Sequence, residues 1–266
     1  MAFWGKKTFC VVTGASRGIG RYFSIEFSRH FADGSVVVLL ARSEAALDDT
    51  RAAILKNNPN LRVSAARVDL SRPAAGAYRK IVKAALDEHK LSPSDVDLAL
   101  LVNNAGTVGD VSQAARDAGD PAQWQDYLSL NVTSCVCFTA QFLQVFGADS
   151  VKKTVVNITS LSAVAPMKSF AYYCVGKAAR EMYFRVLAEE SPDVDVLNYS
   201  PGPIDTDMVS EVIDNVGRKD MRDMFVNLKD TQKLVTLDQT TSRIIKILEE
   251  GKYSSGDHVD YYDTKF

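Results

Sequence analysis

The chain has 266 residues, of which 46% are hydrophobic, and this length suffices for one α/β domain with a large core. Its 31 Lys and Arg residues nearly balance its 33 Asp and Glu residues, so the net charge is −2. A nucleic-acid partner is therefore not expected, because no excess of positive charge is available to bind a phosphate backbone.

Short β-branched runs alternate along the chain with longer helix-forming segments. Runs that are apolar on both faces predict strands covered on both sides, over residues 8–12, 36–40, 62–68, 97–102, 154–159 and 194–199. Apolar residues at helical spacing predict helices over 19–31, 43–57, 74–88, 122–146 and 171–190. The alternation predicts an α/β fold with a doubly wound parallel sheet and helices on both faces.

No internal repeat, low-complexity tract or long linker divides the sequence, so we expect a single domain over residues 1–266. The least regular segment, 200–237, follows the last predicted strand. Because ligand-binding loops lie at the carboxyl ends of the strands in such folds, this segment is a candidate substrate lid.

The first predicted strand runs into the sequence TGASRGIG, Thr13 to Gly20, and a helical pattern follows at once. Gly14 permits a tight turn, Gly18 lets the backbone approach a pyrophosphate, and Gly20 lets the helix pack on the strand. A phosphate would bind at the helix N-terminus, where free N–H groups and the helix dipole favour an anion. We expect a dinucleotide to contact Gly14, Ser16, Arg17, Gly18, Ile19 and Gly20.

The residues after the second predicted strand indicate which dinucleotide binds. A site for NAD needs a carboxylate there for the ribose 2′-OH, whereas this chain has Arg42 and Ser43. Arg42 and Arg17 would instead bind a 2′-phosphate, because guanidinium groups pair well with phosphate oxygens. The expected cofactor is NADP(H).

Two further strand ends fit the same crevice. After the third predicted strand, the Asp69 carboxylate would accept from the adenine amino group, and the backbone at Leu70 would cover the ring. After the fourth comes NNAG, whose amides can brace neighbouring loops while its small residues approach the ribose. The cofactor-binding residues expected in NNAG are Asn103, Ala105 and Gly106.

The four cysteines form no C-x-x-C pair and stand near no histidine at metal-ligand spacing, so no metal site is expected. The apolar run Phe9 to Val12 is too short for a signal peptide, and no segment approaches the ~18 apolar residues of a membrane span. We therefore expect a cytoplasmic protein without membrane contact.

The motifs TG-x-x-x-G-x-G, N-N-A-G, a serine and Y-x-x-x-K occur in this order, and together they resemble the short-chain dehydrogenase/reductase family over nearly the whole chain. The resemblance implies a single Rossmann-type domain and hydride transfer to or from a nicotinamide. It also assigns roles to three residues besides the tyrosine. Ser160, thirteen residues before Tyr173, would hydrogen-bond the substrate carbonyl, Lys177 would hold the nicotinamide ribose, and Asn131 would complete a proton relay through water.

The spacing distinguishes the two adjacent tyrosines. Tyr173 and Lys177 are four residues apart and share a helix face, while Tyr172 lies about 100° round the helix from Tyr173. Tyr173 is therefore the expected acid. A lysine cation roughly 4 Å away would contribute about 4 kcal/mol at an effective dielectric of ~20, enough to lower the pKa of the phenol from ~10 towards ~7.

A narrower resemblance is carried by SLSAVAPMKSFAYYCVGKAARE, NYSPGPIDTDM, AGTVGDVS and the tail SSGDHVDYYD. It is to the members of this family that reduce the side-chain carbonyls of pterins, and it implies a pterin substrate and a homodimer joined through the helices at 122–146 and 171–190. Asp260, in the tail 254–263, would anchor the pterin, since a carboxylate can accept from a ring N–H and an exocyclic amino group together. The implied contacts with the nicotinamide are Ile204 and Thr206, and those with the substrate are Ser160, Leu161, Tyr173, Gly202 and Asp260.

Two alternatives to a pterin reductase remain at this point. One is an NADPH carbonyl reductase that acts on quinones or small diketones, and it differs from the first hypothesis chiefly at Asp260. The other is a non-enzymatic NADP-sensing protein on the same fold. The intact set of Ser160, Tyr173 and Lys177 argues against the sensor, because a sensor has no need of an acid–base pair.

Overall fold

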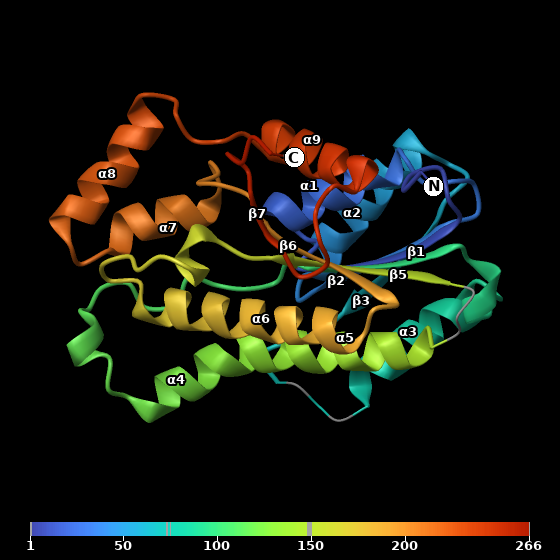
Figure 1. The fold of residues 1–266 in the computed structure, drawn as a ribbon, viewed down its shortest axis with the longest axis horizontal. Helices are drawn as coiled ribbons and strands as arrows, with labels where there is room; N and C mark the ends of the chain where they lie inside the picture. The colour runs from blue at the N-terminus through green and yellow to red at the C-terminus, as the bar shows by residue number, and fades with distance from the viewer. Residues whose placement is uncertain (1, 73, 75, 148–150, 266) are drawn as a thin grey trace.

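The computed structural model describes residues 2–72, 74, 76–147 and 151–265. A seven-stranded sheet forms the centre of the described chain, and every neighbouring pair of strands is parallel (Figure 1). The strands are β1 (Thr8–Thr13), β2 (Val36–Ala41), β3 (Arg62–Arg67), β4 (Leu98–Asn103), β5 (Lys152–Ile158), β6 (Val194–Ser200) and β7 (His258–Asp260). Their order, β3-β2-β1-β4-β5-β6-β7, confirms the predicted doubly wound sheet.

Helices cover both faces of the sheet, as predicted (Figure 1). Neighbouring residues of each strand point to opposite faces: Val12 packs in one hydrophobic cluster and Val11 in the other. The first cluster includes side chains of α1 (Gly18–Ser28), α2 (Glu44–Asn57) and α9 (Leu237–Glu250). The second includes side chains of α3 (Ala77–Glu88), α5 (Ser134–Val145) and α6 (Ala171–Glu190).

The segment 200–237 is more regular than the sequence indicated. It contains α7 (Asp207–Asn215) and α8 (Lys219–Asp230), whose apolar side chains pack with Val108, Val111 and Phe170. A bridge between Ile204 and Val235 joins the two ends of the segment. This third cluster fixes α7 and α8 beside the carboxyl edge of the sheet, where a substrate lid would be required.

A long helical stretch runs through α4 (Pro121–Leu128), the π-helical turn η3 (Ser129–Thr133) and α5. Its 25 residues are long and apolar enough to cross a membrane by length and composition alone, and 33% of its most apolar window is buried. The expectation that no segment approaches this limit was therefore wrong. Core helices also meet this criterion, and here Phe138 and Phe142 pack in the second hydrophobic cluster.

Candidate active site

The glycine-rich turn between β1 and α1 has the geometry that its sequence predicted. Gly14 and Gly18 have positive φ angles of 71° and 54°, which favour glycine. A Cβ on Gly20 would lie 2.3 Å from the carbonyl oxygen of Gly14, so only glycine lets α1 pack this closely on the turn. The Asn104 amide braces the turn from the next strand end by donating to the Thr13 carbonyl at 2.9 Å.

The N-terminus of α1 is suited to an anion. Arg17 occupies the N-cap position, and its side chain makes no capping hydrogen bond with the described residues. If a Cβ were added to Gly18, the nearest atom to it would be Thr206 Cγ2, at 4.0 Å, so the space beside Gly18 is open. This open space, next to free N–H groups at a helix N-terminus, fits the pyrophosphate of a dinucleotide.

The residues expected to select the dinucleotide are exposed after β2. Arg42 lies at the surface, while Ser43 caps α2 by accepting a hydrogen bond from the Ala46 amide at 3.4 Å. Arg17 lies 2.7 Å from Asp207 of α7, and both side chains are largely exposed. Such an exposed pair contributes little free energy, so Arg17 can leave Asp207 for a phosphate at small cost.

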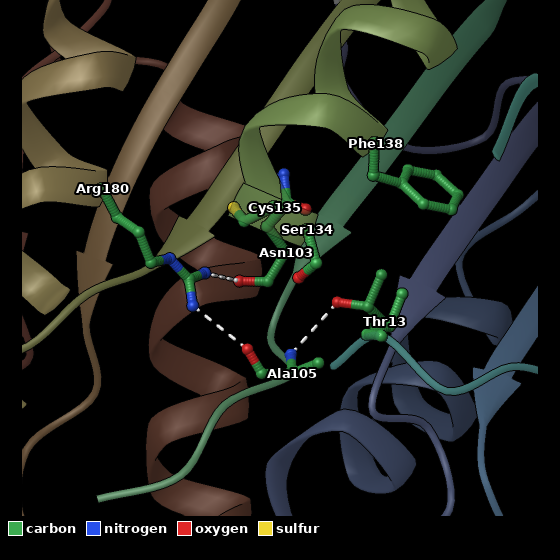
Figure 2. Close-up of a pocket in the computed structure, with 8 residues that line it drawn as sticks. Thr13, Asn103, Ala105, Ser134, Cys135, Phe138 and Arg180 are labelled. Carbon is green, nitrogen blue, oxygen red and sulfur yellow. Dashed lines mark hydrogen bonds between the residues drawn. The ribbon is translucent and has the colours of Figure 1, made fainter. Parts of the chain in front are cut away.

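The ends of β3 and β4 meet the glycine-rich turn. Figure 2 shows the Ala105 amide directed at Thr13 Oγ1, the acceptor of its hydrogen bond at 3.0 Å. Leu70 is buried and lines the same cavity as Ala105, whereas Asp69 is exposed. Hydrogen bonds from Ser71, with a smaller effect of the nearby arginines, lower the pKa of Asp69, so this carboxylate remains an acceptor near neutral pH.

Ser160, Tyr173 and Lys177 come together at the carboxyl end of β5. Ser160 precedes a short turn of 3-10 helix, η4 (Leu161–Ala163), and it lies close enough to the Tyr173 phenol to lower the pKa of that group. Lys177 Nζ lies 5.4 Å from the centroid of the Tyr173 ring. Tyr172 points elsewhere: it stacks on Trp124 with centroids 4.1 Å apart and donates to Gln123 Oε1 at 3.1 Å.

The charge state of this group differs from the sequence-based expectation. Burial raises the pKa of Tyr173, while Ser160 and the Arg180 guanidinium lower it by less. Burial also holds the pKa of Lys177 well below its usual range, and Lys177 Nζ donates to the Ile158 carbonyl at 2.6 Å. The expectation that the Lys177 cation brings the pKa of Tyr173 towards neutrality was therefore wrong, because burial raises this pKa and Lys177 is not among the groups that lower it.

Asn131 lies in the π-helical turn η3 and is 3% exposed. Its Oδ1 accepts from the Thr107 amide at 2.8 Å, and its Nδ2 donates to the Tyr127 carbonyl at 2.9 Å. The same Oδ1 would lie 2.8 Å from a Cβ on Gly106, so glycine is required at that position. Asn131 thus fixes the loop after NNAG, and π-helical turns of this kind are frequent at functional sites.

The segment after β6 reaches both the glycine-rich turn and the tail. Thr206 lies next to Gly18, as described above, and Ile204 is buried at the base of the candidate lid. Gly202 has a φ of 78°, and an added Cβ would lie 3.6 Å from the Tyr262 ring. Leu161, the first residue of η4 after Ser160, is 56% exposed.

The strand β7, which the sequence did not predict, holds Asp260 at the carboxyl edge. Asp260 is partly buried and pairs in register with Ser200 of β6. Its Oδ2 accepts from Ser200 Oγ at 2.6 Å, and its Oδ1 accepts from the Tyr262 amide at 3.0 Å. Each carboxylate oxygen can accept a second hydrogen bond, so Asp260 is held in place and still able to bind two parallel donors.

Sequence reasoning missed a buried set of charged residues on α6 and β7. Arg180 is 1% exposed and Glu181 is 3% exposed. Glu181 Oε2 accepts from Thr159 Oγ1 at 2.7 Å and lies 2.8 Å from His258 Nδ1. The spacing of Arg180 from Tyr173 and Lys177 could have indicated its burial, because it places all three residues on one stripe of α6.

Comparisons with known proteins agree with this geometry. The family model described as short chain dehydrogenase matches residues 8–217. The sepiapterin reductase of Meriones unguiculatus is 40% identical over 256 residues, with 96% of each chain covered. The benzil reductase ((S)-benzoin forming) of Bacillus subtilis is 28% identical over 247 residues, covering 91% of this chain and 93% of the relative.

Among solved structures, a short chain dehydrogenase/reductase from Saccharomyces cerevisiae superposes with a TM-score of 0.80, at 25% identity and 97% coverage of each chain. The sequence match, the strand order and the shared motifs all agree. The chain belongs to the short-chain dehydrogenase family of oxidoreductases.

Proposed function

We propose that the protein is an NADPH-dependent reductase of pterin side-chain carbonyls. It would convert sepiapterin to dihydrobiopterin and 6-pyruvoyl-tetrahydropterin to tetrahydrobiopterin. The observation that carries this proposal is the placement of Asp260 at the same sheet edge as Ser160. The Thr159 amide donates to Tyr199 on β6, and Ser200 pairs with Asp260 on β7, so two strand spacings separate the anchor from the serine.

Adjacent strands lie about 4.8 Å apart, so the separation is on the order of 10 Å. This is the scale of a bicyclic pterin together with its first side-chain carbons. With its ring N–H and exocyclic amino group on Asp260, a pterin would present its side-chain carbonyl to Ser160 and Tyr173. The sepiapterin reductase relative described above supports the same substrate class.

The cofactor would lie along the carboxyl edge from the glycine-rich turn to Thr206. Its pyrophosphate would bind the N-terminus of α1, and a 2′-phosphate would bind Arg42 and Arg17. When bound, the reduced nicotinamide supplies hydride to the carbonyl carbon. The absence of a carboxylate directly after β2, at Arg42 and Ser43, favours NADPH over NADH.

Tyr173 would give its phenolic proton to the carbonyl oxygen as that oxygen gains negative charge, and the product is an alcohol. Ser160 would donate a hydrogen bond to the same oxygen and stabilise the developing charge. Lys177 is fixed by the Ile158 carbonyl below the Tyr173 ring, where it would also hold the cofactor ribose. Asn131 would pass a replacement proton towards Tyr173 through water.

A second candidate function is the reduction of small diketones. The benzil reductase relative favours it, because benzil is a diketone and the match covers most of both chains. The acid–base residues serve every carbonyl alike, so they do not separate the two functions. Asp260 does, since a small diketone has no paired N–H donors for it.

Exposed apolar side chains support the further proposal of a homodimer. Val175, Met182 and Val186 lie along α6 and are 46%, 57% and 45% exposed. Their spacing places them on one stripe of the helix, and a second copy of this helix would cover them. Met182→Glu would then shift the sedimentation of the protein from dimer to monomer.

Steady-state kinetics with NADPH test the proposed function directly. The expected result is a kcat/KM for sepiapterin at least tenfold above that for benzil. Efficient reduction of benzil with little reduction of sepiapterin would support the diketone reductase instead. A protein that binds NADPH but reduces neither carbonyl would contradict both functions.

A further inference from the structure

Arg180 is fully buried without a carboxylate partner. Its Nε donates to Asn157 Oδ1 at 3.0 Å. Its Nη1 donates to the Ala105 carbonyl at 3.1 Å and its Nη2 to the Asn103 carbonyl at 2.6 Å (Figure 2). All three acceptors are uncharged, and no ion pair among the described residues includes Arg180. Arginine is rarely buried this deeply unless an anion accompanies it.

A second buried basic group lies beside the first. Lys177, three residues before Arg180 on the same face of α6, is 7% exposed and donates to a carbonyl rather than a carboxylate. Charge on both groups at once would cost free energy, and burial together with the charge of Arg180 lowers the pKa of Lys177. Sites with such fixed positive charge are typical of places where negative charge develops during a reaction.

Among the groups near Arg180, the Tyr173 phenol is the one that loses a proton in the proposed reaction. Tyr173 lies four residues before Lys177 and seven before Arg180, on the same stripe of α6. Arg180 Nη1 also lies 3.7 Å from the position of a Cβ on Gly106, in the loop that Asn131 fixes. The guanidinium therefore lies behind the residues that face the substrate.

We propose that Arg180 is a positioning residue for proton transfer: its fixed charge stabilises the tyrosinate that remains when Tyr173 gives up its proton, and its hydrogen bonds hold the Asn103–Ala105 turn in place. This inference rests on the proposed role of Tyr173 as proton donor. Arg180 is better suited than Lys177 to supply the charge. A guanidinium stays protonated when buried, whereas an ammonium in the same surroundings loses its proton readily.

The remaining groups around Tyr173 do not replace this charge. Burial raises the pKa of Tyr173, and the influences that lower it are Ser160 and Arg180, in that order. Glu181, next to Arg180 in sequence, pairs with His258 and Thr159. The other titratable groups that face Tyr173, Lys177 or Arg180 are Tyr127 of α4, Cys135 of α5 and Cys174 of α6.

The test is the pH dependence of kcat in the NADPH-saturated enzyme, with whichever carbonyl the wild-type protein reduces. Arg180→Met should move the midpoint of the alkaline limb upward by about one pH unit, the effect of one charge about 10 Å away at an effective dielectric of ~20. Asn157→Asp is a second variant of nearly unchanged shape. It places a carboxylate on Arg180 and should move the midpoint in the same direction, even if Arg180→Met does not fold.

Lys153→Met is the matched control. Lys153 is also a buried cation, but it pairs with Asp193 at 2.7 Å near the opposite end of β5, and its loss should leave the midpoint unchanged. Wild-type midpoints in both Arg180→Met and Asn157→Asp would overturn the role of Arg180 while leaving the proposed function intact. If the wild-type enzyme reduced neither carbonyl, the proposed function itself would fail.

Discussion

His258 Nδ1 lies 2.8 Å from the buried carboxylate of Glu181, so β7 is joined to α6 beside the candidate anchor Asp260. The hydrogen bond with Glu181 raises the pKa of His258 above its ordinary value of 6.5, against a smaller opposing effect of burial. Because the folded pKa is the higher one, the pair stabilises the fold fully below about pH 6.5 and loses this contribution as pH rises through the folded pKa.

Urea unfolding between pH 5.5 and 8.5 measures this effect. The stability of the wild-type protein minus that of His258→Asn should shrink as pH rises. His89 has a lowered pKa and the opposite dependence, but it is present in both proteins and cancels in the difference. Parallel stability curves for the two proteins would show that the pair does not titrate as described.

Tyr173→Phe should lower kcat by about 10²–10⁴-fold while NADPH still binds, because the lost hydroxyl acts only as the proton donor. Tyr172→Phe is the matched control on the neighbouring residue. It removes the hydrogen bond to Gln123 and should cost about 0.5–1.5 kcal/mol of stability with little effect on kcat. Stopped-flow measurements follow NADPH binding, and steady-state rates give kcat for each variant. A large loss of kcat in Tyr172→Phe with little loss in Tyr173→Phe would show that Tyr172 is the acid.

Gly20→Ala should destabilise the protein by about 1–3 kcal/mol and weaken NADPH binding, since the added Cβ would lie 2.3 Å from the Gly14 carbonyl oxygen. Gly119→Ala is the control, because nothing lies within 4 Å of its added Cβ. Chemical denaturation and a fluorescence titration with NADPH measure both properties. Equal stability and affinity in the two variants would mean that the turn can relax around the extra methyl group.

Arg42→Asp should move the cofactor preference from NADPH towards NADH, because it removes a guanidinium from the 2′-phosphate and supplies a carboxylate for a ribose 2′-OH. The ratio of kcat/KM for the two cofactors, in the wild-type protein and the variant, measures the change. Arg72→Asp is a control of equal charge change at a nearby arginine. A wild-type enzyme that uses both cofactors equally would contradict the assignment of Arg42.

The sequence predicted the turn and the helix that hold the site residues, because the motifs that indicate them are local in sequence. A glycine-rich turn between an apolar strand and a helix, and a tyrosine and lysine one helical turn apart, need no distant partner to be recognised. The helix predicted over 171–190 is found as α6, at Ala171–Glu190. The roles expected for these residues are still predictions, since geometry places them together without testing their chemistry.

What sequence reasoning missed depends on tertiary contacts. Arg180 and Glu181 are charged residues on a helix, which ordinarily face solvent, and their burial follows from strand ends distant in sequence. β7 has three residues, too few for a periodic pattern, and exists because it pairs with β6. The lowered pKa of Lys177 likewise comes from the surrounding fold and not from its spacing to Tyr173.

The measurement that tests the proposed function most directly is the effect of Asp260→Ala on two substrates. The kcat/KM for sepiapterin should fall by an amount that corresponds to about 2–4 kcal/mol of transition-state stabilisation, the scale of losing charge-assisted hydrogen bonds. The kcat/KM for benzil should stay nearly unchanged. Asp257→Ala is the control for a loosened tail, because Asp257 accepts from the Ser254 amide at 2.9 Å in the turn before β7. Equal losses on both substrates after Asp260→Ala, or no loss on either, would contradict a pterin anchor at Asp260.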